Sequence, residues 1–177
     1  MLTEKVEKAL NEQINKEIYS FYLYLSMAAW TKGENLPGFS AWLEAQAEEE
    51  MMHAMKIYRY LDERGGTIRL TSIDTPPAEW DSPQNLFDEV LAHEKLVTAS
   101  IHDLVKVARG EDDVAAEVFL QWFVTEQVEE EASVGEVVDD MKRLGDSTHG
   151  LFMKDRELGR RGATTALFNP ALGGGEE

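Results

Sequence analysis

The amino-acid sequence predicts an all-α protein, an antiparallel four-helix bundle with one long crossover between its second and third helices and a short fifth helix after the fourth. Three observations predict this fold. Four stretches, each about 27 to 33 residues long, contain almost no glycine or proline. Apolar residues recur along them at three- and four-residue spacing. One connection between them is long, and the others are short.

The first two helices are bounded by glycine and proline. Gly33 ends the first stretch, Pro37 and Gly38 open the second, and Gly65 with Gly66 closes it. We expect these helices at residues 3–32 and 38–64.

The later helices have similar boundary signals. Ser82 and Pro83 are an N-cap residue and a proline at the first helical position. Gly110 ends that helix and Gly145 ends the next. We expect helices at 83–109, 112–144 and 148–161, the last with many charged residues, and a flexible tail over 162–177.

The connections set the topology. Short linkers after the first and third helices make each pair antiparallel. The linker from 65 to 81 spans about 56 Å when extended at roughly 3.3 Å per residue. A helix of 27 residues is about 40 Å long. The linker can therefore return along the whole bundle, and residues 1–161 form one domain.

Composition excludes several classes of protein. The chain has 177 residues and a net charge of −17, from 34 acidic and 17 basic residues, which disfavours binding to nucleic acid. It has no cysteine, so disulfides, thiolate metal sites and thiol catalysis are excluded. It has neither a run of 18 apolar residues nor a signal-peptide pattern. We expect a cytoplasmic protein that does not bind membranes.

Polar residues interrupt the apolar stripe of every long helix. The first two stripes are Val6, Leu10, Gln13, Glu17, Phe21, Tyr24, Ala28 and Phe39, Leu43, Gln46, Glu50, His53, Ile57, Tyr60. The third and fourth are Phe87, Leu91, Glu94, Thr98, Ile101, Val105 and Ala116, Leu120, Phe123, Gln127, Glu130, Val134, Val137, Met141. The acids lie near the helix midpoints, so the four helices bring them to one central layer.

A metal site explains this layer best. A glutamate is rarely buried without a partner, and no lysine or arginine occupies these positions. Four carboxylates carry −4, which two divalent cations balance, and their oxygen and imidazole ligands suit iron, manganese or zinc. The alternatives are acids at the edge of each stripe, or a carboxylate and amide network without metal.

These residues resemble the prokaryotic non-haem ferritins, members of the ferritin-like di-iron superfamily. The superfamily pattern is a Glu from each of two helices and Glu-x-x-His from each of the other two. Glu17 and Glu94 match the single acids, and Glu50-Met51-Met52-His53 matches one Glu-x-x-His. Gln127-Val128-Glu129-Glu130 replaces the second, as in non-haem ferritins. The likeness covers about residues 3 to 161.

The resemblance implies a ferroxidase centre. Glu17 and His53 would hold one iron, Glu50 would bridge, and Glu94 with Glu130 would hold the second iron. Gln127 would be a weak ligand or a hydrogen-bond partner. The remaining implied residues are Glu49, Glu126 and Glu129 at a further iron site that shares Glu130, and Tyr24 and Trp122 as redox-active aromatic residues beside the centre.

The resemblance also implies the activity and the assembly. Fe(II) would be oxidised by O2 or H2O2 and stored as ferric oxyhydroxide inside a hollow 24-subunit shell. A second apolar face on the first helix favours subunit contacts independently, because a monomer would leave it wet: Tyr19, Leu23, Met27 and Trp30.

Several alternatives remain. Met51 follows the bridging acid, where bacterioferritins ligate haem, but the His of their last helix is missing. Rubrerythrin-like peroxidases usually need cysteines, and Dps-type proteins place their metal between subunits. A metal-free bundle or a passive metal carrier is the alternative from another class. We assign no ligand role to His93, His102 and His149, and residues 167–172 are either a docking peptide or part of the tail.

Overall fold

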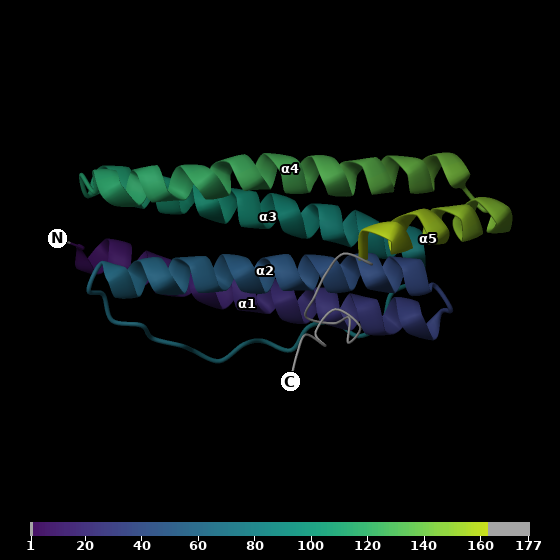
Figure 1. Ribbon diagram of the computed structural model, residues 1–177, viewed down its shortest axis with the longest axis horizontal. Coiled ribbons are helices and arrows are strands. Elements are labelled where there is room, and N and C mark those ends of the chain that lie inside the picture. Colours follow the sequence, from purple (N-terminus) through teal and green to yellow (C-terminus); the bar gives the residue numbers. More distant parts are fainter. Residues whose placement is uncertain (1, 163–177) are drawn as a thin grey trace, which may run out of the picture.

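The structure, a computed structural model, describes residues 2–162, which form five helices and no strand (Figure 1). The helices are α1 (Glu4–Gly33), α2 (Pro37–Glu63), α3 (Pro83–Gly110), α4 (Val114–Leu144) and α5 (Thr148–Gly162). The predicted fold class is confirmed. The expected tail lies outside the described residues beyond Gly162, and so does the segment 167–172.

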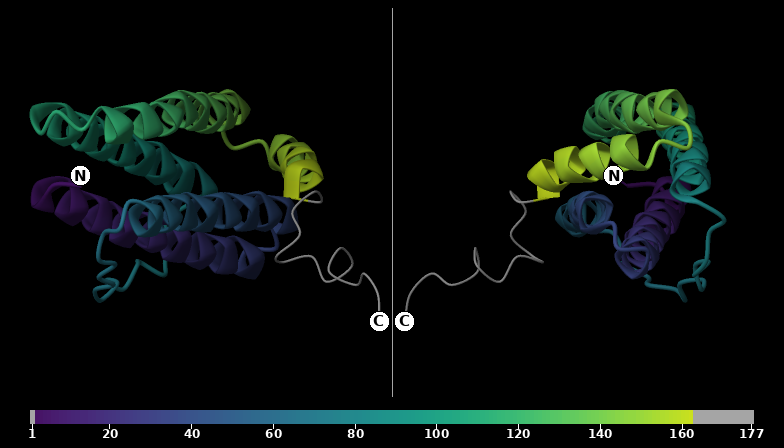
Figure 2. Two further views of the ribbon diagram at one scale, coloured as in Figure 1. Left: turned by 60° about the vertical axis from the view of Figure 1, so that its left-hand side comes forward. Right: turned by 90° about the vertical axis from the view of Figure 1, so that its right-hand side faces the viewer.

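The four long helices form two antiparallel pairs, α1 with α2 and α3 with α4 (Figure 2). α2 ends at the end of the bundle where α1 begins, and α3 begins at the opposite end. The crossover therefore runs the length of the bundle along α1. It is held there by the polar side of that helix: Asn11 Nδ2 donates to the carbonyl of Thr67 at 2.9 Å and Asn15 Nδ2 to that of Ser72 at 3.0 Å.

Side-chain caps define three helix starts. Thr3 accepts from the Val6 amide and Ser82 from the Asn85 amide. α4 begins at Val114, two residues later than expected, because Asp112 has a positive φ of 52° and Asp113 is the N-cap, accepting from the Ala116 amide at 3.0 Å.

α2 is capped by a side chain from another helix. Its own N-cap residue, Leu36, offers no side-chain acceptor. Asp155 of α5 instead accepts from the amides of Gly38 at 2.7 Å and Phe39 at 3.1 Å. A Cβ at Gly38 would lie 1.6 Å from the Asp155 carbonyl oxygen, so this close packing of α5 on α2 requires glycine.

The apolar core of the described chain is in two parts, one toward each end of the bundle. One part includes Phe39, Phe87 and Val134, and the other includes Leu10, Ile57 and Leu120. The predicted polar layer lies between them.

The predicted core faces need three corrections. Phe21 of α1 and Tyr60 of α2 are only partly buried. In α3 the buried stripe is turned slightly, because Leu91 and Val105 are only partly buried and other apolar residues fill the core: Leu86, Val90, Val97 and Leu104. The expectation that the second apolar face of α1 is exposed was wrong. Leu23 and Met27 are buried in the monomer, and Trp30 packs edge-on against Trp80 of the crossover at 5.9 Å between ring centroids.

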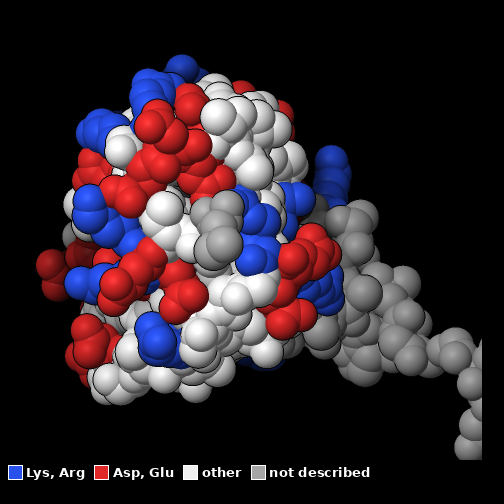
Figure 3. Space-filling model, turned by 90° about the vertical axis from the view of Figure 1, so that its left-hand side faces the viewer, with Lys and Arg blue, Asp and Glu red and all other residues white. Residues whose placement is uncertain are grey.

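Charged residues of both signs cover the end of the bundle where α1 begins, with acidic ones prominent (Figure 3). Several form ion pairs there, among them Lys5 with Glu111 at 2.6 Å and Arg64 with Asp113 at 2.9 Å. Among residues 2–162, none of the helices combines the length with the apolar character that a membrane span requires.

Candidate metal centre

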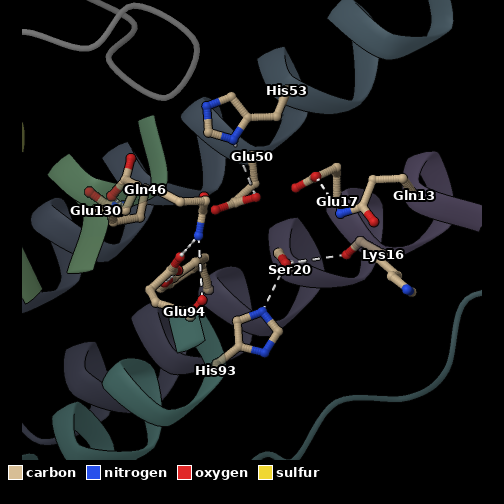
Figure 4. A network of polar contacts seen from close by, with 12 residues as sticks. Gln13, Lys16, Glu17, Ser20, Gln46, Glu50, His53, His93, Glu94 and Glu130 are labelled. Carbon is tan, nitrogen blue, oxygen red and sulfur yellow. Dashed lines mark hydrogen bonds and ion pairs between the residues drawn. The ribbon is translucent and has the colours of Figure 1, made fainter. Parts of the chain in front are cut away.

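Six polar side chains from four helices meet in the middle of the bundle. All are buried, with at most 4% of their surface exposed, and Figure 4 shows the carboxylates pointing toward one another. They are Glu17 of α1, Glu50 and His53 of α2, Glu94 of α3, and Gln127 and Glu130 of α4. The three-residue spacings of Glu50 and His53, and of Gln127 and Glu130, place both members of each pair on one helix face.

Two groups of three side chains have the spacing of metal ligands. In the first, ligand atoms of Glu17, Glu50 and His53 all lie within 4.8 Å of one another. His53 Nδ1 is 3.6 Å from Glu50 Oε2. All three residues are buried.

The second group is His53, Glu126 and Glu130, within the same 4.8 Å limit. Glu126 is only partly buried, so this group lies toward the surface. The residues predicted for a further metal site therefore differ in their surroundings. Glu126 joins a group, Glu49 is partly buried and raises the pKa of Glu130 through its charge, and Glu129 is exposed and belongs to neither group.

The electrostatics of the layer oppose four ionised acids. Desolvation, reinforced by neighbouring carboxylates, raises the pKa of Glu17 and of Glu50 well above the ordinary value, and desolvation raises that of Glu94. The pKa of Glu130 rises to about 7, through burial and the charge of Glu49. His53 acts in the opposite direction on Glu17, Glu94 and Glu130, but it does not offset the effect of burial on their pKa values.

Three carboxylate oxygens of the layer have no hydrogen-bond partner among the described residues: Glu17 Oε2, Glu50 Oε1 and Glu50 Oε2. A buried polar group without a partner costs about 1–3 kcal/mol, and more when it is charged. Hard oxygen donors together with one imidazole fit a divalent first-row cation. A cation among these oxygens would both supply the missing partners and lower the raised pKa values.

Glu94 is held from two sides. The Tyr24 hydroxyl donates a hydrogen bond to Glu94 Oε1, and Gln127 Nε2 donates to Glu94 Oε2 at 3.2 Å. Burial and the nearby carboxylates raise the pKa of Tyr24 well above its ordinary value, so the phenol stays protonated and remains a donor.

A groove of about 740 Å³ between α2 and α4 connects this layer with the surface. His53 lines it together with the partly exposed Glu49 and Glu126. Trp122, 39% exposed, stands edge-on to His53 at 5.5 Å, and the Lys56 ammonium lies 4.1 Å from the centre of its indole ring. A cation at that place makes the indole harder to oxidise, which weighs against Trp122 as an electron donor.

Met51 also lines the groove, with Met52 and Met55. The three histidines to which no ligand role was assigned belong to neither group of possible ligands. Of these three histidines, Figure 4 shows His93. Its Nε2 pairs with Ser20 Oγ at 2.8 Å, and burial lowers its pKa to about 4.

Sequence reasoning assigned no role to Gln13 and Gln46, which contact the acids directly. Gln13 Nε2 donates to Glu17 Oε1 at 2.8 Å, and Gln46 Nε2 donates to Glu130 Oε2 at 2.7 Å. The signal was present in the sequence, because each lies four residues before an acid of the layer on the same apolar stripe.

The comparisons with known proteins agree with this architecture. The ferritin-like domain model matches residues 7–144. A bacterial non-heme ferritin of Bacteroides fragilis is 42% identical over 161 residues, covering 91% of this chain and 100% of its own. That of Escherichia coli O157:H7 is 38% identical over 158 residues, covering 89% and 96%.

A solved structure gives the same result. The open-pore ferritin of the archaeon Archaeoglobus fulgidus superimposes with a TM-score of 0.89 and 48% identity, covering 90% of this chain and 98% of its own. The family model spans most of the chain, and the relatives exceed a third in identity over nearly all of it. This chain therefore belongs to the ferritin family.

Proposed function

We propose that this protein is an iron-storage ferritin with ferroxidase activity. It binds Fe(II) as substrate in the buried carboxylate layer, oxidises it with O2 or peroxide, and deposits ferric oxyhydroxide inside a hollow shell of 24 subunits. The observation that carries the proposal is the layer itself, with four buried glutamates and a histidine and with unpartnered carboxylate oxygens. The relatives named bacterial non-heme ferritin support it.

The contacts favour a division of the ligands between two iron ions. Glu17 and His53 hold the first ion, in keeping with their close approach to Glu50. Glu94 and Glu130 hold the second. Glu50 bridges, because both of its oxygens are without partners and its charge interacts with that of Glu94. Gln127 acts as a hydrogen-bond donor to Glu94, one of the two roles expected for it.

Reduction of O2 to H2O2 takes two electrons, and one Fe(II) ion supplies only one, so two ions must lie side by side. Each ion gives one electron to the same O2, and with two protons the products are two Fe(III) and H2O2. The chain's part is to hold the two ions close together, exclude bulk water and keep donors in place. Tyr24 hydrogen-bonds a ligand acid, and we propose that it also gives an electron when one more is needed.

We propose that iron moves between the buried centre and the protein surface through the groove between α2 and α4. Glu126 lies within 4.8 Å of both His53 and Glu130, so one carboxylate joins the centre to the groove. We propose a further iron site at Glu126 and Glu130 with Glu49. Glu129 is the weakest member of that set because it is exposed and outside the group.

An aerobic assay tests the activity. Fe(II) is added to the shell and the near-ultraviolet absorbance of ferric oxo species is followed. We expect wild type to oxidise iron much faster than buffer and Glu50→Ala to lose most of this rate. Glu136→Ala, which removes an exposed acid of α4 outside the groove, is the matched control and should behave as wild type. Oxidation by wild type at the rate of buffer would refute the proposal.

A further inference from the structure

Three of the four glutamates of the central layer accept a hydrogen bond from a glutamine amide. Gln13 donates to Glu17 at 2.8 Å, Gln46 to Glu130 at 2.7 Å, and Gln127 to Glu94 at 3.2 Å. The three amides are themselves buried, with 2%, 0% and 3% of their surface exposed. Each donor comes from the helix of its acceptor or from another helix of the layer.

Glu50 is the exception. Both of its oxygens are buried, and neither accepts a hydrogen bond from an amide or a hydroxyl group among the described residues; its neighbours are two other members of the layer, Glu17 and His53. This is the acid to which we assign the bridging role, in which each oxygen faces one metal. The three acids with amide partners are those assigned to a single metal each. The bridging role of Glu50 already rests on this observation; the amide hydrogen bonds add that the three acids assigned to a single metal each have one oxygen held by a glutamine.

An amide donor suits this task better than a charged one. Lysine or arginine would neutralise the negative charge that binds cations, whereas an amide orients a carboxylate and leaves its charge in place. Within residues 2–162 no ion pair joins a lysine or arginine to Glu17, Glu94 or Glu130.

The orientation of the Gln13 amide is fixed by a contact to its oxygen. Its Oε1 accepts from Ser100 Oγ at 2.6 Å, and Ser100 in turn accepts from the Lys16 ammonium at 2.6 Å. Because the oxygen of the amide is engaged there, its NH2 group must face Glu17. Glu17 Oε1 is thereby occupied, and Oε2 is the oxygen left without a partner.

The orientation of the Gln46 amide is fixed by the acid to which it donates. Its NH2 group faces Glu130, and its buried Oε1 has no partner among the described residues. The carboxylate acceptor decides this orientation, because the reversed amide would set two acceptors against each other. The free Oε1 can accept a hydrogen bond from a water molecule in the site.

We propose that Gln13 and Gln46 are positioning residues, one for each metal: Gln13 holds Glu17 so that a single oxygen faces the first metal, and Gln46 holds Glu130 in the same way for the second. This inference rests on the proposed function. It assigns each glutamine an effect on one metal position, which a role in packing alone would not produce.

Cobalt(II) binding tests the proposal without iron oxidation. Assembled metal-free protein is titrated with Co(II) by calorimetry, and crystals soaked in limiting Co(II) assign the positions by anomalous scattering. Loss of such an outer partner typically weakens metal binding about 10- to 100-fold. We expect Gln13→Leu to weaken the position beside Glu17 and His53 by this factor and to spare the other. Gln46→Leu should do the reverse.

Two further variants keep the test decisive if leucine impairs folding. Gln13→Asn and Gln46→Asn keep the amide but withdraw it by one methylene, and they should show the same selectivity. Gln121→Leu, at an exposed position of α4, should change neither position. Equal weakening at both positions, or none, would overturn the positioning roles while wild type still binds two Co(II). If wild type binds no Co(II) in the layer, the proposed function itself fails.

Discussion

Glu50 shows at the level of one residue how function and stability oppose each other. It is fully buried, burial and the charges of neighbouring carboxylates raise its pKa, and neither of its oxygens accepts a hydrogen bond from an amide or a hydroxyl group in the described chain. A residue chosen for stability alone would not carry a charge there. The same buried carboxylate that lowers the stability of the metal-free protein attracts cations.

We therefore expect Glu50→Gln to stabilise the metal-free protein at pH 8 while preventing it from holding two metal ions. At pH 8 the buried carboxyl must either carry a charge or take up a proton, and a neutral amide avoids both, so the free energy of unfolding should rise by roughly 1–3 kcal/mol. Thermal unfolding in a chelator measures this, with Glu136→Gln as the exposed control. A lower melting temperature for Glu50→Gln would mean that the layer has internal partners for this charge.

The raised pKa of Glu130 predicts a pH dependence. Its carboxyl has a pKa of about 7 in the folded chain against an ordinary 4.5, so between these values the folded state holds a proton that the unfolded state has released. Stability from this group is complete below pH 4.5 and is lost as pH rises through 7, by about 3 kcal/mol in all. Buried His93, with its pKa near 4, has the opposite sign, but only below about pH 6.5.

The measurement is thermal unfolding of the metal-free protein from pH 6.5 to 8, where the effect of His93 is complete and the last part of the Glu130 effect, about 1 kcal/mol, is still to be lost. We expect a falling melting temperature, a smaller fall for Glu130→Gln, and little fall with saturating Zn(II). A melting temperature that is constant or rising in wild type would contradict the raised pKa.

At the scale of elements, the sequence predicted the fold class because its signals were local. Helix boundaries such as Gly33 and Ser82–Pro83 are readable from the residues themselves. What sequence reasoning missed depends on neighbours. Leu23 and Met27 were expected at the surface, and the structure buries them; Trp30 packs on the crossover residue Trp80, a contact that helical periodicity cannot show.

The site follows the same rule. Periodicity along each helix placed Glu17, Glu50, His53, Glu94, Gln127 and Glu130 on core faces, and the structure buries all six. The hydrogen bonds from Gln13 and Gln46 depend on side-chain direction and, for Gln46, on a different helix, so the stripe showed these residues without showing their role.

The contact between α5 and α2 gives a prediction for one element. Asp155→Ala removes the acceptor for two amides at the start of α2 and should cost roughly 0.5–2 kcal/mol, the usual effect of losing a cap. Hydrogen exchange at the first turn of α2 should speed up in that variant. Arg160→Ala, at an exposed position of α5, is the control. Unchanged exchange would show that the cap does not hold the helix start.

At the scale of the whole molecule, the structure gives the excess of acidic residues a second interpretation. The charge of −17 first served to disfavour nucleic acid as a partner. The structure now places four of the acids in the centre of the bundle. If the proposed shell forms, the remaining acids of every subunit would add to the charge that attracts iron to it.

Assembly is itself testable. The argument from the second face of α1 is lost, but several apolar side chains remain exposed on the described monomer, among them Leu96, Val118, Val128 and Phe152. We expect light scattering at moderate ionic strength to show a large, uniform particle. A mass near that of the 20.0 kDa chain would contradict a shell.

The most direct measurement of the central claim is anomalous diffraction at the iron edge from crystals of wild-type protein soaked in Fe(II). We predict two iron positions in each subunit, within the layer of Glu17, Glu50, His53, Glu94 and Glu130, with Glu50 between them. Crystals of Glu50→Ala should not hold the pair. Iron found only at surface acids, with none in the buried layer, would contradict the account.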